Sequence, residues 1–92
     1  MSEFRKIVEI TNRRGLHARA SAKFVTYVSK LPDSLDVREA TDGTEVTGMS
    51  ILGLMMLGAA KGDSIEIIVA GEHAESALEK LTGLVVDGFG ED

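Results

Sequence analysis

The sequence contains no cysteine and no tryptophan, one proline, and two histidines in 92 residues. Without cysteine the chain can form neither a disulfide bond nor a thiolate metal site, which fits a reducing compartment. The histidines, His17 and His73, stand far apart in the sequence, so we expect no metal site and no cofactor. Long apolar runs are also missing. Nothing approaches the ~18 apolar residues of a membrane-spanning helix, and MSEFRKIVEI lacks the apolar run of a signal peptide. These absences predict a cytoplasmic protein that does not insert into a membrane.

Positive charge is scarce, with 10 Lys and Arg residues against 15 Asp and Glu, and a net charge of −5 at pH 7. Nucleic acids need a basic footprint on the protein, so this balance argues against nucleic acid as a partner. Aromatic residues make up 4% and hydrophobic residues 43% of the chain, which indicates a core of aliphatic side chains. The length is that of one small domain, which we expect to span residues 1–92 as a monomer.

Apolar periodicity and turn signals predict four strands and three helices. The strands are expected over residues 4–10, 34–40, 44–47 and 64–70, with Asp42 and Gly43 as the turn of a hairpin. The helices are expected from the junction at His17 to about residue 29, from 51 to about 57, and from 72 to about 86, followed by a frayed tail over 88–92. The order β-α-β-β-α-β-α favours an α+β fold, an open-faced sandwich in which a four-stranded, largely antiparallel sheet carries three helices on one face.

The same periodicity groups side chains on shared faces. Helical spacing in the first helix places four apolar residues together, namely Ala18, Ala22, Val25 and Val28. In the second strand Leu35 and Val37 share one side, with Glu39 as a further candidate for it. The strand over 64–70 is the most apolar, which indicates a central position in the sheet.

The stretch from Asn12 to Tyr27, NRRGLHARASAKFVTY, changes from loop to helix, and His17 stands at the change. The N–H groups of a first helical turn lack partners and favour anions, so a group bound to His17 would lie close to them. Arg19 adds a guanidinium that suits phosphate oxygens, and a neutral imidazole beside it could accept a phosphoryl group. From these residues alone a plainer interpretation stays open, in which His17 only caps the helix and Arg19 is a solvated surface residue.

A second stretch, from Thr47 to Gly62, combines a serine with a short and very apolar helix. Ser50 precedes the apolar run, where a serine is typical of a helix N-cap. So apolar a helix cannot bury every side chain in so small a domain, and methionines on an exposed face suit contact with several partners. The alternative stays open on periodicity alone: all the methionines of this stretch could belong to the core.

Two motifs together carry a resemblance to a known family. GLHARASA, from Gly15 to Ala22, resembles the active-site signature G-[LI]-H-x-R-[PA] of HPr, the histidine-containing phosphocarrier of the bacterial phosphotransferase system, and of its nitrogen-related paralogue. MSILGLMMLGAAKGDSIEI, from Met49 to Ile67, resembles the regulatory-serine region of the same family. The length and the element order match over essentially the whole chain. The resemblance implies a component of phosphotransfer and not a stand-alone catalyst.

The resemblance also implies a role for each motif residue. His17 would be phosphorylated on Nδ1 by the phosphorylated form of enzyme I, which draws on phosphoenolpyruvate, and would pass the group to a histidine of a IIA protein or domain. Arg19 would stabilise the phosphoryl group, and the amides of Ala18 and Arg19 would hold its oxygens. Ser50 stands where many members carry a serine phosphorylated by HPr kinase/phosphorylase, which weakens transfer through His17. The docking surface for enzyme I and IIA proteins would consist of Ala18, Ala22, Ile51, Leu52 and Met55.

The chain departs from the family pattern at three places. Ala20 stands where proline is commonest, so the first helical turn lacks a preset backbone angle. Arg13 and Arg14 slightly lengthen the loop before the signature. Gly48 and Met49 replace the lysine often found before the regulatory serine.

Two functions of other classes are compatible with these residues. A pure interaction module would bind and regulate a partner through the apolar second helix, independently of phosphate on His17. A small-ligand-binding α+β domain would need a pocket, for which so small an aliphatic domain rarely has room. The phosphocarrier and the interaction module differ in whether activity depends on His17.

Overall fold

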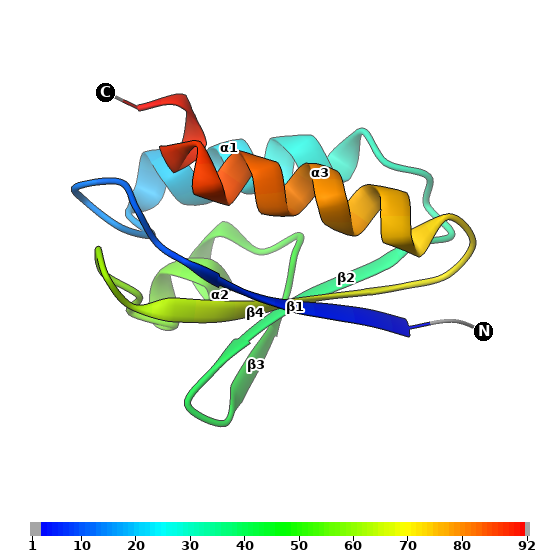
Figure 1. The fold of residues 1–92 in the computed structure, drawn as a ribbon, viewed down its shortest axis with the longest axis horizontal. Helices are drawn as coiled ribbons and strands as arrows, with labels where there is room; N and C mark the ends of the chain where they lie inside the picture. The colour runs from blue at the N-terminus through cyan, green and yellow to red at the C-terminus, as the bar shows by residue number, and fades with distance from the viewer. Residues whose placement is uncertain (1–2, 92) are drawn as a thin grey trace.

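The structure of the protein, a computed structural model, describes residues 3–91. Its elements are β1 (Glu3–Glu9), α1 (Ala18–Ser29), β2 (Asp36–Thr41), β3 (Thr44–Thr47), α2 (Ile51–Met56), β4 (Ser64–Ala70), α3 (Ala74–Val86) and the 3-10 turn η1 (Gly88–Gly90). The four strands form one sheet in the order β1-β4-β2-β3, and every neighbouring pair is antiparallel. Figure 1 shows α1 and α3 side by side over one face of this sheet, and α2 adjoins α1. The predicted open-faced sandwich is confirmed.

Turn chemistry explains where the elements begin. β2 starts at Asp36 and not at residue 34, because the preceding residues form a turn in which the Leu35 N–H donates to the Pro32 carbonyl at 3.0 Å. α3 starts at Ala74 and not at residue 72, because His73 has left-handed backbone angles (φ 63°, ψ 25°) that a helix does not accommodate. The remaining predicted ends differ from the observed ones by one residue or less.

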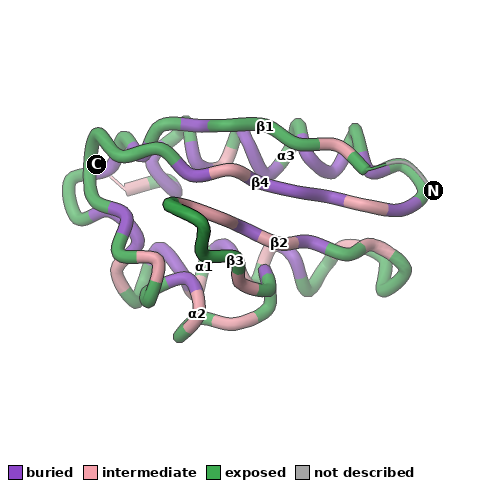
Figure 2. Tube along the Cα trace, turned by 90° about the horizontal axis from the view of Figure 1, so that it is seen from below, coloured by how far each residue is buried: buried purple, intermediate pink, exposed green. Residues whose placement is uncertain are grey.

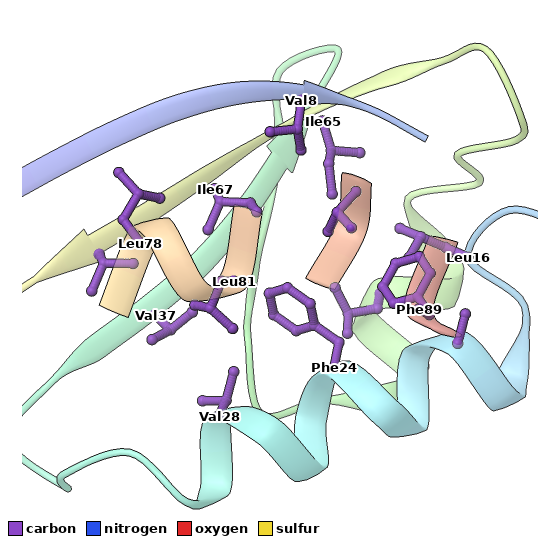
Figure 3. Packing of buried hydrophobic residues seen from close by; sticks show 14 of the residues in the cluster. Val8, Leu16, Phe24, Val28, Val37, Ile65, Ile67, Leu78, Leu81 and Phe89 are labelled. Carbon is purple, nitrogen blue, oxygen red and sulfur yellow. The ribbon is translucent and has the colours of Figure 1, made fainter. Parts of the chain in front are cut away.

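The core lies between the sheet and the helices. β4 is central and is the most continuously buried strand, as predicted, and it is mostly purple in Figure 2. Figure 3 shows Phe24 and Val28 pointing from α1 into a cluster that also holds Leu81 of α3. The predicted face of α1 is therefore partly wrong. Its buried side runs through Ala20, Phe24 and Val28 at a spacing of four, and Ala18 is exposed. Phe24 offers more apolar surface than any alanine, and its burial therefore decides which face of α1 packs against the sheet.

The end of the chain is not the frayed tail that the sequence predicts. Residues 88–90 form η1, and the side chain of Phe89 is 1% exposed within the same core cluster. Lys23 of α1 donates from Nζ to the Phe89 carbonyl oxygen at 2.9 Å. Burial of one aromatic ring therefore outweighs the flexibility of the flanking glycines. Asp92 lies outside the described residues.

Glu39 is the one fully buried acidic side chain among residues 3–91. It lies on β2 opposite Val46 of β3 and Ile67 of β4, and neither carboxyl oxygen has a hydrogen-bond partner among the described residues. A Cβ added to Gly48 would lie 3.1 Å from Glu39 Oε2 and 2.8 Å from Val37 Cγ1. The close approach of residue 48 to these two side chains therefore requires a glycine. Burial in these surroundings raises the pKa of Glu39 from 4.5 to about 8.

None of the helices in residues 3–91 covers the opposite face of the sheet, yet one apolar side chain on that face is shielded. Ile68 of β4 lies between Arg5 of β1 and Arg38 of β2 in the strand register, and its side chain is 0% exposed. The two arginines are held over this face by ion pairs with carboxylates on all four strands, which are Glu3, Asp36, Glu45 and Glu66. Long charged side chains commonly cover apolar neighbours with their aliphatic stems, and we infer that Arg5 and Arg38 shield Ile68 in this way.

Candidate functional site

A tight loop presents His17 at the start of α1. Gly15 has a left-handed φ of 63°, and a Cβ added to it would lie 2.8 Å from the Cα of Ala60, so only glycine fits against this backbone. The Leu16 N–H donates to the Ala59 carbonyl at 2.9 Å, which ties the loop to the segment before β4. His17 then takes an extended conformation (φ −77°, ψ −179°) as the N-cap of α1. The expected junction between loop and helix is observed at this residue.

The imidazole ring of His17 lies across the mouth of α1. Its Nδ1 accepts the Arg19 N–H at 3.3 Å, so the ring supplies the N-cap acceptor that a serine or aspartate usually provides. The first helical hydrogen bond runs from the Ser21 N–H to the His17 carbonyl at 2.9 Å. The Ala18 N–H comes before this first bond along the chain, so it has no partner within the helix. It is one of the free N–H groups of the helix N-terminus, which favours negative charge. The side chain of His17 is 21% exposed, and the contact between Nδ1 and the Arg19 amide is an exposed one, so the ring is not sequestered in the core.

The other ring nitrogen of His17 contacts the end of the chain. Nε2 lies 2.9 Å from Oε2 and 3.1 Å from Oε1 of Glu91. The Asn12 amide donates from Nδ2 to Glu91 Oε1 at 3.1 Å and to the Gly15 carbonyl at 2.9 Å. The hydrogen bond from His17 holds the pKa of Glu91 below its ordinary value, with a further contribution from Asn12, so this carboxyl is ionised at neutral pH.

A hollow of about 510 Å³ opens beside the ring. Its lining is mostly cationic and consists of Arg13, Arg14, His17, Arg19, Lys23, Gly90 and Glu91. Within residues 3–91, none of the three guanidinium groups in it takes part in an ion pair. A protein with a net charge of −5 therefore concentrates positive charge around one histidine, and a multiply charged anion is the ligand that this arrangement suits.

Over residues 3–91 no three His, Cys, Asp or Glu side chains are grouped as metal ligands would be. Over the same residues no helix has the length and apolar character to cross a membrane.

Ser50 and the apolar residues after it form a second region. The Ser50 Oγ accepts the Gly53 N–H at 2.9 Å, so the predicted N-cap role is observed, and the residue is half-buried. α2 buries only Leu54, and its other large apolar side chains are exposed, with Leu52 at 67%. The reading in which the methionines all belong to the core is wrong. The exposed apolar side chains of this region are Met49, Ile51, Leu52, Met55 and Met56.

The expected docking residues lie on two neighbouring helices. Ala18 is exposed and Ala22 half-buried on α1, and Ile51, Leu52 and Met55 are exposed on α2, which packs against α1. In Figure 2 the two helices are neighbours. The structure thus places small apolar side chains beside His17 and larger ones on the adjoining helix.

Sequence reasoning missed three residues of the site: Asn12, Lys23 and Glu91. Glu91 is 74 positions from His17, and no spacing rule brings them together. A usable signal was Phe89, since an aromatic residue in an otherwise polar tail indicates that the tail packs against the fold. With Phe89 anchored, the carboxylate two residues later falls within reach of the ring.

Known proteins resemble this chain along nearly its full length. The family description "PTS HPr component phosphorylation site" matches residues 4–87. Phosphocarrier protein HPr of Neisseria meningitidis is 44% identical over 84 residues, which cover 91% of this chain and 92% of that protein. Phosphocarrier protein HPr of Xylella fastidiosa is 40% identical over 83 residues, covering 90% and 91%. A crystal structure of HPr from Thermoanaerobacter tengcongensis has a TM-score of 0.86 at 36% identity and covers 100% of this chain and 99% of that one.

Proposed function

This chain belongs to the HPr family, the phosphocarrier proteins of the bacterial phosphotransferase system, and we propose that His17 is the residue that carries its phosphoryl group. The position of the ring supports this proposal most strongly. Nδ1 lies 3.3 Å from the Arg19 amide at the mouth of α1, beside a cationic hollow at the surface. A ring sequestered in the core would be inaccessible to a second protein.

The proposed acceptor atom is Nδ1. Its lone pair attacks the phosphorus of a phosphohistidine on enzyme I, which is itself charged from phosphoenolpyruvate. The bond between phosphorus and the donor nitrogen breaks as the new one forms. The amides of Ala18 and Arg19 then donate to the phosphoryl oxygens, and the Arg19 guanidinium moves in from the surface to pair with them. Stabilisation by a helix N-terminus amounts to about 0.3–1 kcal/mol at exposed positions, which is small enough for the group to be passed on.

The proposed recipients are histidines of IIA proteins or domains, and the proposed docking surface is shared by donor and recipient. It combines Ala18 and Ala22 of α1 with Ile51, Leu52 and Met55 of α2. The support is their exposure: an apolar patch beside a charged centre is a common form of protein interface, with the apolar part giving affinity and the rim giving orientation.

Incubation with phosphoenolpyruvate and enzyme I tests the proposal. The protein is expected to take up acid-labile, base-stable phosphate, and His17→Ala is expected to lose it entirely. His73→Ala is the matched control, because His73 is the other histidine of the chain, is exposed, and should leave labelling unchanged. Label on the His17→Ala variant would contradict the assignment. A variant that takes up no label but still binds and regulates a partner would favour the interaction module.

A second, separate proposal concerns Ser50, which we infer to be a site of regulatory phosphorylation by a kinase of the HPr kinase/phosphorylase type. The supporting observation is that Ser50 adjoins the exposed apolar side chains of α2, so a phosphate there would place charge on the proposed docking surface. Treatment with that kinase and ATP should give an acid-stable adduct that Ser50→Ala abolishes. Absence of the adduct in the wild-type chain would remove this proposal and leave the role of His17 untouched.

A further inference from the structure

The chain end brings a carboxylate to the ring nitrogen that lies away from the helix mouth. We propose that Glu91 is a positioning residue for phosphotransfer, which holds the His17 ring with its proton on Nε2 and stabilises the charge that the ring gains during transfer. The proposal rests on the proposed role of His17 as phosphoryl acceptor and adds a residue to it.

Glu91 is held in place by contacts that do not involve the ring. The buried Phe89 anchors the tail, and the Lys23 ammonium donates to the Phe89 carbonyl at 2.9 Å. The Glu91 N–H donates to the Gly88 carbonyl at 3.0 Å, which continues the turn of η1. Asn12 donates to Glu91 Oε1 at 3.1 Å. The carboxylate therefore reaches the ring from a fixed direction, with little conformational freedom left to lose.

Two contacts select the same neutral tautomer of His17. The Arg19 amide is a donor, so the Nδ1 that it contacts must be the acceptor and carries no proton. The Glu91 carboxylate is an acceptor, so Nε2 must carry the proton that is donated to it at 2.9 Å. The lone pair of this tautomer is the one on Nδ1, at the mouth of α1, and it becomes available for chemistry when the Arg19 N–H turns from it to a phosphoryl oxygen.

This tautomer makes the transfer step simple. Nδ1 forms its bond to phosphorus with its lone pair, the donor nitrogen keeps the electron pair of the broken bond, and no proton has to leave His17. The ring becomes more positive as the bond forms, and the Nε2–H becomes a stronger donor. A carboxylate already in contact with that N–H strengthens its hydrogen bond at that moment, as the aspartate of a catalytic triad does for its imidazole. With the proton on Nδ1 instead, deprotonation would have to precede attack.

The test compares the Glu91→Gln variant with the wild type, both as full-length chains. Glutamine keeps the shape of the side chain, but its amide both donates and accepts, so it selects neither tautomer and carries no charge. In 15N spectra of the ring at high pH, the ratio of the Nε2–H to the Nδ1–H tautomer should fall by about tenfold, the factor that corresponds to ~1.4 kcal/mol and to the loss of a charge-assisted hydrogen bond. The rate of His17 phosphorylation at saturating enzyme I should fall by a similar factor.

Glu79→Gln is the matched control, since it removes the same charge from an exposed position on α3, and it should change neither the ring signals nor the rate. Unchanged ring signals in Glu91→Gln would overturn the proposal, and so would altered signals with an unchanged rate. The ring signals are read on the unphosphorylated protein. A wild-type chain that is never phosphorylated, yet loses its tautomer preference in Glu91→Gln, would refute the role of His17 while leaving the contact with Glu91 established.

Discussion

Replacing Glu39 by leucine is expected to stabilise the folded protein at neutral pH, by an amount that grows as the pH rises. Glu39 is fully buried among Val46, Ile67 and Gly48, and its carboxyl oxygens have no partner among the described residues. The folded protein must therefore bury either a protonated carboxyl without a hydrogen bond or an uncompensated charge, and both are costly. Leucine has a similar volume and removes both costs.

The size of the pH-dependent part follows from the pKa of Glu39, which burial raises from 4.5 to about 8. Between these values the unfolded chain has released the proton and the folded chain has kept it, so the free energy of unfolding falls as pH rises. Each pH unit inside the window removes about 1.4 kcal/mol. Between pH 5 and pH 7 the loss is about 2.5 kcal/mol, because the unfolded chain is already partly ionised at pH 5. The loss is complete above pH 8.

Urea unfolding of wild type, Glu39→Leu and Glu39→Gln at pH 5, 6, 7 and 8 measures this effect. The advantage of Glu39→Leu over wild type should increase by about 2.5 kcal/mol from pH 5 to pH 7. Glu39→Gln should lose the same pH dependence, because it does not titrate, while it keeps a buried polar group and gains less stability than leucine. The exposed Glu79→Gln should keep the wild-type dependence. Parallel curves for wild type and Glu39→Leu would refute the reasoning.

Three further substitutions test the packing of the site loop, of the chain end and of the helix-free face of the sheet by thermal or urea unfolding. Gly15→Ala should lower the free energy of unfolding by about 3 kcal/mol, because residue 15 has a left-handed φ and the backbone of Ala59 and Ala60 leaves no room for a Cβ. Gly43→Ala should cost only about 1 kcal/mol, because Gly43 has a similar φ but open space around it. Phe89→Ala should cost about 3–5 kcal/mol, and the exposed Val86→Ala less than about 0.5 kcal/mol; equal effects would show that the tail is not anchored. Ile68→Ala should cost about 2–5 kcal/mol despite lying on the face without helices, and a loss under 1 kcal/mol would mean that the arginines do not shield it.

Local rules were sufficient for most of the fold. The strands alternate, Asp42 and Gly43 form the predicted hairpin turn with φ values of 49° and 81°, and Gly15 precedes a helix N-terminus at His17. Each of these features depends on residues close together in the sequence, where periodicity and turn preferences apply. The orientation of α1 was predicted less well, because apolar spacing alone did not weigh one phenylalanine against several alanines.

The rest of the site depends on tertiary contacts that no local rule contains. Glu91 reaches His17 because Phe89 is anchored in the core, in a cluster that residues of α1, α3 and the sheet form together. Glu39 raises the same difficulty in another form. Alternation along β2 puts it on the side of Val37, but a sequence does not say whether a charged residue at such a position will find a partner. Here none of the described residues provides one.

The most direct test of the proposed function is to identify the nitrogen atom to which the phosphoryl group is bonded. Protein labelled with 15N in both histidine rings is charged with enzyme I and phosphoenolpyruvate, and the coupling between 31P and 15N identifies the nitrogen that holds the phosphoryl group. We predict a single coupling, to Nδ1 of His17, while Nε2 keeps its proton. Coupling to Nε2 of His17 or to either nitrogen of His73 would contradict it.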